Sequence, residues 1–165
     1  MRLWLARLCP FLIPMACVGA VADEPLQNWF NDPFFQITSA IRNCPLPAGP
    51  FTSMADRRAQ AHRRAEKGTT CWLAGECDRP KAYLYDADIA TALRSTAQER
   101  KLFAGSSLWV TVQGRVVYVE GCAARSSDVA RIDAFVRSVP YVQQSSVNVR
   151  TRPSARPPYR LMPAQ

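Results

Sequence analysis

Hydrophobic positions in the second half of the chain alternate in two short runs that a tight turn separates. Residues 108–112 and 116–120 place aliphatic side chains at every second position, which is the pattern of strands with one buried face. We expect a two-residue turn at Gln113-Gly114, because glycine adopts the positive φ that a tight hairpin requires. The pattern therefore predicts an antiparallel hairpin.

The expected turn sets which residues lie opposite each other. Next to the turn, Val112 would lie opposite Arg115. The buried face would hold the pairs Val110–Val117 and Leu108–Val119. The other face would place Trp109 opposite Tyr118, with Thr111 next to them. This face is either a contact surface for lipid or protein or a surface that the amino-terminal segment covers, and we favour the cover.

Helical periodicity occurs on both sides of the hairpin. One helix is predicted from Asp86, its cap, to about Gln98, and a second from about Ser127 to Pro140. Alternation returns over residues 142–150 and predicts a third strand. The expected fold class is α+β, an αββαβ core with two helices on one face of a three-stranded sheet, joined by an amino-terminal arm and helix that disulfides stabilise.

The order and spacing of these elements over residues 85–151 resemble the BON domain, a small module of bacterial cell-envelope proteins. Gly114 in the turn and Gly121 at the end of the second strand match the family pattern. Pro140-Tyr141 departs from it, because the family commonly has a Gly-Val pair before the last strand. The resemblance implies an αββαβ fold, phospholipid binding and a role in envelope integrity.

Residues 53–67 are predicted to form a separate basic helix. Ser53 can cap it with Asp56 as the partner in a capping box, and Gly68 can end it. The apolar residues are mainly alanines, which we expect on the buried side. Four cations share one arc of this helix, and we consider them candidates for binding anionic lipid: Arg57, Arg63, Arg64 and Lys67. The alternative is an ordinary solvated face.

Composition divides the rest of the chain. The boundaries are a signal peptide over 1–22, an arm with the basic helix and a cysteine loop over 23–84, the BON-like domain over 85–151 and a disordered proline-rich tail over 152–165. Cleavage is expected after Ala22, and an uncleaved anchor or lipid attachment at Cys17 are the alternatives. The arm is rich in proline and aromatic residues, which indicates an extended segment packed on the domain.

Four cysteines follow the predicted leader: Cys44, Cys71, Cys77 and Cys122. An even number in an exported chain predicts two disulfides in an oxidising compartment. Three pairings are open. A Cys71–Cys77 bond would close a short loop, and Cys44 is the obvious partner for Cys122.

The chain has a formal net charge of +8. In an exported protein this charge favours anionic phospholipid over nucleic acid as a partner. His62 is the only histidine, and no hydrolase motif occurs, so we expect no enzyme, cofactor or metal site. The sequence predicts a non-catalytic protein of a Gram-negative periplasm that binds the envelope. The alternative is a docking subunit of a larger envelope or secretion assembly with a protein partner.

Overall fold

The computed structural model describes residues 24–163. The predicted signal peptide, its cleavage site and the alternatives at Cys17 therefore lie outside the described residues. Within the described range, no helix combines the length and the apolar character that crossing a bilayer requires.

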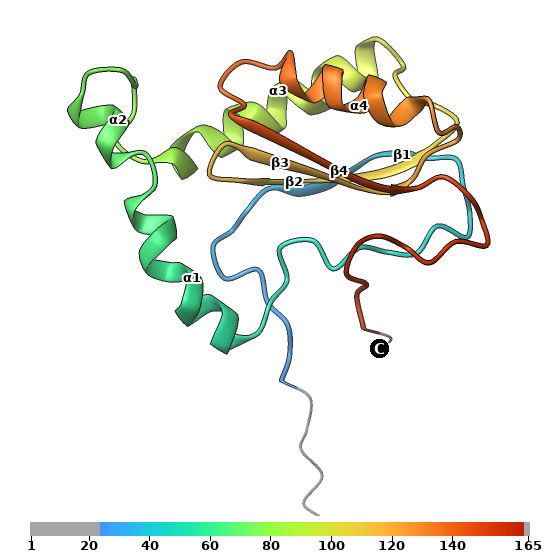
Figure 1. Ribbon diagram of the computed structural model, residues 1–165, viewed down its shortest axis with the longest axis horizontal. Coiled ribbons are helices and arrows are strands. Elements are labelled where there is room, and N and C mark those ends of the chain that lie inside the picture. The colour runs from blue at the N-terminus through green and yellow to red at the C-terminus, as the bar shows by residue number, and fades with distance from the viewer. Residues whose placement is uncertain (1–23, 164–165) are drawn as a thin grey trace, which may run out of the picture.

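A mixed sheet forms the centre of the molecule (Figure 1). Its order is β1-β2-β3-β4, with β1 and β3 antiparallel to β2, and β4 parallel to β3. The expected count of three strands is wrong, because the arm adds a strand along the free edge of β2. The strands are β1 (Phe34–Ser39), β2 (Ser107–Gln113), β3 (Val116–Cys122) and β4 (Gln144–Arg150).

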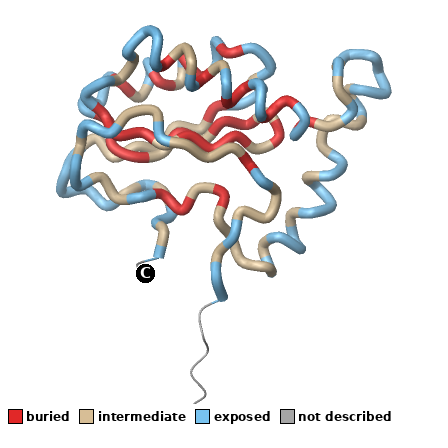
Figure 2. Tube along the Cα trace, turned by 180° about the vertical axis from the view of Figure 1, so that it is seen from behind, coloured by how far each residue is buried: buried red, intermediate tan, exposed pale blue. Residues whose placement is uncertain are grey.

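Two helices, α3 (Asp86–Glu99) and α4 (Asp128–Arg137), cover one face of the sheet, and a short 3₁₀ turn, η1 (Ala82–Tyr85), leads into α3. Buried residues concentrate between these helices and the strands (Figure 2). The core contains Ile89 and Leu93 from α3, Ile132 and Val136 from α4, and the inward valines of β2 and β3. The aliphatic face that alternation predicted is thus the buried one.

The hairpin turn lies one residue later than predicted. Gly114 and Arg115 are the two turn residues, with φ of 55° and 67°, as a type I′ turn requires. Val112 therefore pairs with Val117, and Trp109 with Glu120 rather than Tyr118. The register moves by two residues, which preserves the faces of both strands and changes only the partners.

Helix α1 (Met54–Glu66) lies on the other side of the sheet, and α2 (Thr69–Leu73) follows it at the end of the molecule. Ser53 and Asp56 form the predicted capping box. The expected orientation of α1 is wrong, since none of its residues is buried. Its four alanines are all exposed: Ala55, Ala59, Ala61 and Ala65.

The proline-rich carboxy-terminal segment also differs from expectation. Residues 152–163 lie against the arm beneath the sheet (Figure 1). Pro47 and Leu161 form an antiparallel bridge, and the Ala48 amide donates to the Arg160 carbonyl at 2.8 Å. Prolines hold both segments extended, and two extended segments can share backbone hydrogen bonds without regular side-chain periodicity.

Both expected cysteine pairs lie at disulfide distance. Cys44 pairs with Cys122 across a sequence separation of 78, with 5.8 Å between Cα atoms. Cys71 pairs with Cys77 across a separation of 6, with 5.4 Å between Cα atoms. The first bond joins the arm to the end of β3, and the second closes the loop that contains α2.

Candidate functional site

The outer face of the hairpin lies toward the arm. Thr111 is 3 % exposed, whereas Trp109 and Tyr118 are half-buried. The arm pairs with β2 through β1 and is bonded to β3 through Cys44. Of the three residues proposed for an interaction face, only Trp109 and Tyr118 therefore retain surface.

A groove with polar and apolar lining separates α1 from the part of this face that the arm leaves open. It consists of two adjoining pockets of about 390 and 380 Å³. Arg63, Gln113 and Tyr118 line both pockets and form the boundary between them. We call this space, between α1 and strands β2 and β3, the α1 groove.

Charged side chains of both signs line the α1 groove. Arg63 lies at its centre, Lys67 at the end toward the hairpin turn, and Arg160 and Glu120 at the end toward the carboxy-terminal segment. Burial lowers the pKa of Lys67, although Asp86 acts in the opposite direction. Burial raises the pKa of Glu120, and Arg160 opposes that shift. Lys67 and Glu120 are thus partly desolvated, whereas Arg63 and Arg160 are exposed. Partly desolvated charges interact more strongly than charges in open water.

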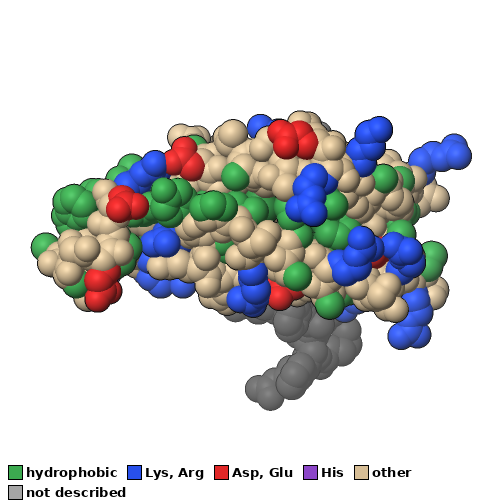
Figure 3. Space-filling view, turned by 90° about the horizontal axis from the view of Figure 1, so that it is seen from above, with side chains coloured by type: hydrophobic (Ala, Val, Ile, Leu, Met, Phe, Trp, Pro, Cys, Tyr) green, Lys and Arg blue, Asp and Glu red, His purple; other side chains and the backbone are tan. Residues whose placement is uncertain are grey.

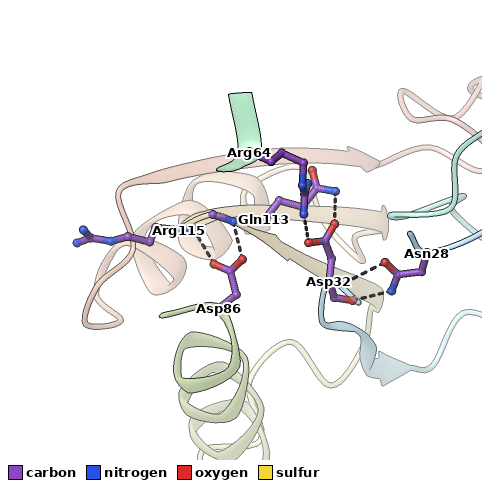
Figure 4. Close-up of polar contacts among 7 residues, drawn as sticks. Asn28, Asp32, Arg64, Asp86, Gln113 and Arg115 are labelled. Atoms are coloured by element: carbon purple, nitrogen blue, oxygen red, sulfur yellow. Dashed lines mark hydrogen bonds and ion pairs between the residues drawn. The ribbon is translucent and has the colours of Figure 1, made fainter. Parts of the chain in front are cut away.

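Arg64 has a different environment from its neighbours on α1. Its guanidinium forms an ion pair with Asp32, which is 5 % exposed, and lies 4.0 Å from the centroid of the Phe30 ring. Asp32 also accepts a hydrogen bond of 2.7 Å from the Gln113 side chain (Figure 4). Asn28 holds the backbone of Asp32 in place. Arg64 therefore joins α1 to the arm and to β2.

Arg57 also contacts an aromatic side chain of the arm. Its guanidinium lies 5.7 Å from the centroid of the Trp29 ring, and the Trp29 indole donates to the Thr52 carbonyl at 2.8 Å. The four cations predicted to bind lipid therefore have different environments. Arg63, Arg64 and Lys67 line the groove, but Arg64 is paired with Asp32 of the arm, and Arg57 contacts the arm.

Asp86 fixes the hairpin turn at the end of the groove. Its carboxylate accepts hydrogen bonds from the backbone amides of Gly114 at 2.6 Å and Arg115 at 2.7 Å (Figure 4). Burial raises the pKa of Asp86, while these two amides act against the rise. The sequence predicted Asp86 only as a helix cap, and its bonds to the turn explain why the turn residues are Gly114 and Arg115.

The sequence did not indicate the residues at the end of the groove toward the carboxy-terminal segment. Arg160 comes from a segment that we expected to be disordered, and its guanidinium donates to the Phe51 carbonyl at 2.6 Å. Glu120 follows the alternation of β3, but nothing in the pattern shows that a basic helix lies opposite it. Among the residues described, no three His, Cys, Asp or Glu side chains gather closely enough to hold a metal ion.

Comparison with known proteins agrees with the order of elements. A family model described as the BON domain matches residues 85–153, which contain α3, β2, β3, α4 and β4. No curated protein and no solved structure matches the chain. The BON domain is a non-catalytic binding module that is associated with phospholipid and with the bacterial envelope. The match confirms over residues 85–153 the resemblance to the BON domain that the sequence pattern indicated.

Proposed function

We propose that this protein is a non-catalytic, periplasmic envelope protein that binds anionic phospholipid through the α1 groove. One observation carries the proposal: Arg63 and Lys67 line the groove, and neither forms an ion pair within residues 24–163. A phosphate between them would receive two charge-assisted hydrogen bonds. It would also offset the desolvation of Lys67, which lowers the pKa of that ammonium.

Lipid is favoured over other anions by two further observations. The family association is with phospholipid and the envelope, and the chain has a net charge of +8, which draws a protein toward an anionic bilayer. Tyr118 is half-buried at the centre of the groove. Its ring offers an apolar wall and its hydroxyl a hydrogen-bond donor, a combination suited to the border between head group and acyl chain.

Vesicle flotation tests this proposal directly. The chain without its predicted leader is mixed with vesicles of phosphatidylcholine, with and without phosphatidylglycerol, over a salt series. We expect binding that requires phosphatidylglycerol and weakens as salt rises. A protein that ignores these anionic vesicles at low salt would overturn the proposal.

A charge-matched pair of variants separates the groove from general basicity. Arg63→Glu with Lys67→Glu should lower vesicle affinity at least tenfold, because each cation near an anionic surface contributes about 1 kcal/mol. Arg58→Glu with Arg100→Glu changes the net charge equally at exposed positions outside the groove, and it should lose clearly less affinity, because neither side chain would contact a phosphate in the groove. Equal losses in both variants would refute a role for the groove.

One feature favours docking to an envelope assembly as a second candidate function. Strand β4 ends the sheet order, and no other strand of the described residues pairs with its outer edge. Its sequence contains neither proline nor lysine, two residues that commonly protect edge strands. Pairing with another chain at this edge should persist at high salt without lipid, and sedimentation analysis at low and high salt measures it.

A further inference from the structure

The segment that follows α1 exposes an unusual amount of apolar surface. Leu73 is 79 % exposed and Trp72 is 45 % exposed, both on α2. With Tyr83 and Leu84 on η1, they make up four of the seven large hydrophobic side chains that are exposed among the described residues. Figure 1 shows α2 projecting from the end of the body, and Figure 3 shows hydrophobic side chains gathered at that end.

Covalent and backbone constraints hold this segment outward. The Cys71–Cys77 bond closes a loop around α2. Gly68, at φ 96°, begins the helix so close to the next segment that an added Cβ would lie 2.6 Å from the Ala82 amide nitrogen. The segment is therefore closed by a disulfide and packed at its base against the backbone of Ala82. We call Trp72, Leu73 and this disulfide-closed loop the α2 knob.

The α2 knob adjoins the α1 groove. Lys67 lines the groove, and only Gly68 separates it from α2. The Lys81 ammonium donates to the Thr69 hydroxyl at 2.9 Å. Tyr83 also lines the groove. Cations thus lie at the base of the knob and apolar side chains at its tip, an arrangement that matches the change from phosphate to acyl chain across the border of a bilayer.

Acidic residues limit the electrostatic attraction between the α2 knob and an anionic bilayer. Glu76 lies within the disulfide-closed loop and Asp78 directly follows it, and both are exposed. Arg79 is paired with Asp88. The disulfide-closed loop itself therefore carries one acid and no cation. Its contribution to binding has to come from burial of Trp72 and Leu73, while the groove supplies the attraction for anionic head groups.

The size of the knob favours a bilayer over a folded protein as the occupant. A buried aromatic side chain removes about 150–250 Å² from water, so a tryptophan and a leucine together give well under the roughly 800 Å² that each partner of a stable protein interface buries. A bilayer needs no matching surface, and tryptophan is enriched at the level of its head groups. Exposed apolar side chains on a constrained loop suit insertion into that layer.

We propose that the α2 knob inserts Trp72 and Leu73 into the interfacial layer of the bilayer whose head groups the α1 groove binds. The inference rests on the proposed function and adds a surface outside the BON domain. In this arrangement the groove selects anionic lipid and the knob fixes the depth and orientation of the protein at the membrane.

Tryptophan fluorescence measures the depth of the knob. Wild-type protein is bound to phosphatidylglycerol vesicles that contain phospholipid brominated along the acyl chain, and Trp72→Phe is measured beside it. We expect a blue shift and bromine quenching in the wild type. Trp72→Phe should keep its flotation, since phenylalanine is also apolar, and lose most of the quenching. Quenching that is unchanged in Trp72→Phe would overturn insertion of the knob.

Flotation of a second variant tests the contribution to affinity. Leu73→Glu should bind these vesicles about tenfold more weakly, because a carboxylate opposes entry into the apolar layer. Leu46→Glu is the matched control, since Leu46 is 47 % exposed and lies on the arm away from the knob. Flotation by all variants, with Leu73→Glu equal to wild type, would refute the knob and leave the groove in place. No flotation by the wild type would refute both.

Discussion

Arg64 of helix α1 forms an ion pair with Asp32 of the amino-terminal arm. The pair turns the basic side of α1 toward the sheet and leaves the alanines of the helix in solvent. A helix whose polar side faces the body of the protein cannot pack closely against it, because its charges would lose water without enough partners. The α1 groove is the space that results, and Arg63 and Lys67 remain within it.

Removing this pair should destabilise the protein. Asp32→Ala leaves the Arg64 guanidinium, 14 % exposed, without its acid, and we expect a loss of about 3 kcal/mol in the free energy of unfolding. Chemical denaturation measures it. Asp88→Ala removes the exposed partner of Arg79 and should cost less than about 1 kcal/mol. A loss for Asp32→Ala no larger than for Asp88→Ala would show that the buried pair does not hold α1.

The two faces of β2 should respond differently to substitution. Val110→Asp places an unpaired charge at a side chain that is 1 % exposed, and we expect it to unfold the domain. Thr111 points to the other face, and its buried hydroxyl has no hydrogen-bond partner among the described atoms. Thr111→Val should therefore be neutral or stabilise by up to about 1 kcal/mol. Thermal melts test both, and a destabilised Thr111→Val would indicate a hidden partner for the hydroxyl.

The two disulfides should contribute unequally to stability. Replacing both Cys44 and Cys122 by alanine opens a loop with a separation of 78 residues, for which chain entropy predicts a loss of about 4.5 kcal/mol. The same change at Cys71 and Cys77 removes a cross-link with a sequence separation of only 6. Chain entropy predicts a loss of about 2.4 kcal/mol in the free energy of unfolding. Urea denaturation compares them. The opposite order would mean that the short loop supports the core.

Binding to anionic vesicles should strengthen as pH falls. Burial raises the pKa of Glu120 in the folded protein, against Arg160, so this carboxylate gains a proton at a higher pH than an ordinary glutamate. Its protonation removes a negative charge from the α1 groove, whose other charged groups at that end include Asp56 and Arg63. Glu120→Gln should bind more tightly at neutral pH and lose most of the pH dependence.

The raised pKa of Glu120 also makes the stability of the folded protein depend on pH. Because the folded-state pKa of Glu120 lies above its ordinary value, its contribution to stability is greatest below the ordinary pKa and declines as pH rises through the raised one. Glu120→Gln should thus gain stability over wild type at neutral pH and lose the advantage in acid. Glu99→Gln, at the exposed end of α3, is the control and should retain the wild-type pH profile for binding and unfolding.

Local side-chain periodicity was enough to identify the elements that bury one face, namely the hairpin and the two helices that cover it. Alternation over 108–112 and 116–120 identified the hairpin and its buried face, and the spacing of Ile89, Leu93, Ile132 and Val136 identified the two covering helices. Such a pattern is local, because each element must bury one face wherever the others lie. The family resemblance and the even number of cysteines extended this to a BON domain and two disulfides.

The positions of the remaining segments depend on contacts between parts of the chain that are far apart in sequence. The arm supplies a fourth strand, the carboxy-terminal segment joins it between Pro47 and Leu161, and the Asp86 carboxylate places the hairpin turn. Helix α1 was the clearest failure of the local pattern, because its alanines are exposed while the more polar Arg64 is partly buried against the arm. Its orientation depends on Asp32, 32 residues away along the chain from Arg64. The periodicity of α1 gives no information about a partner at that distance along the chain. The α1 groove could therefore not be predicted from the sequence of the helix.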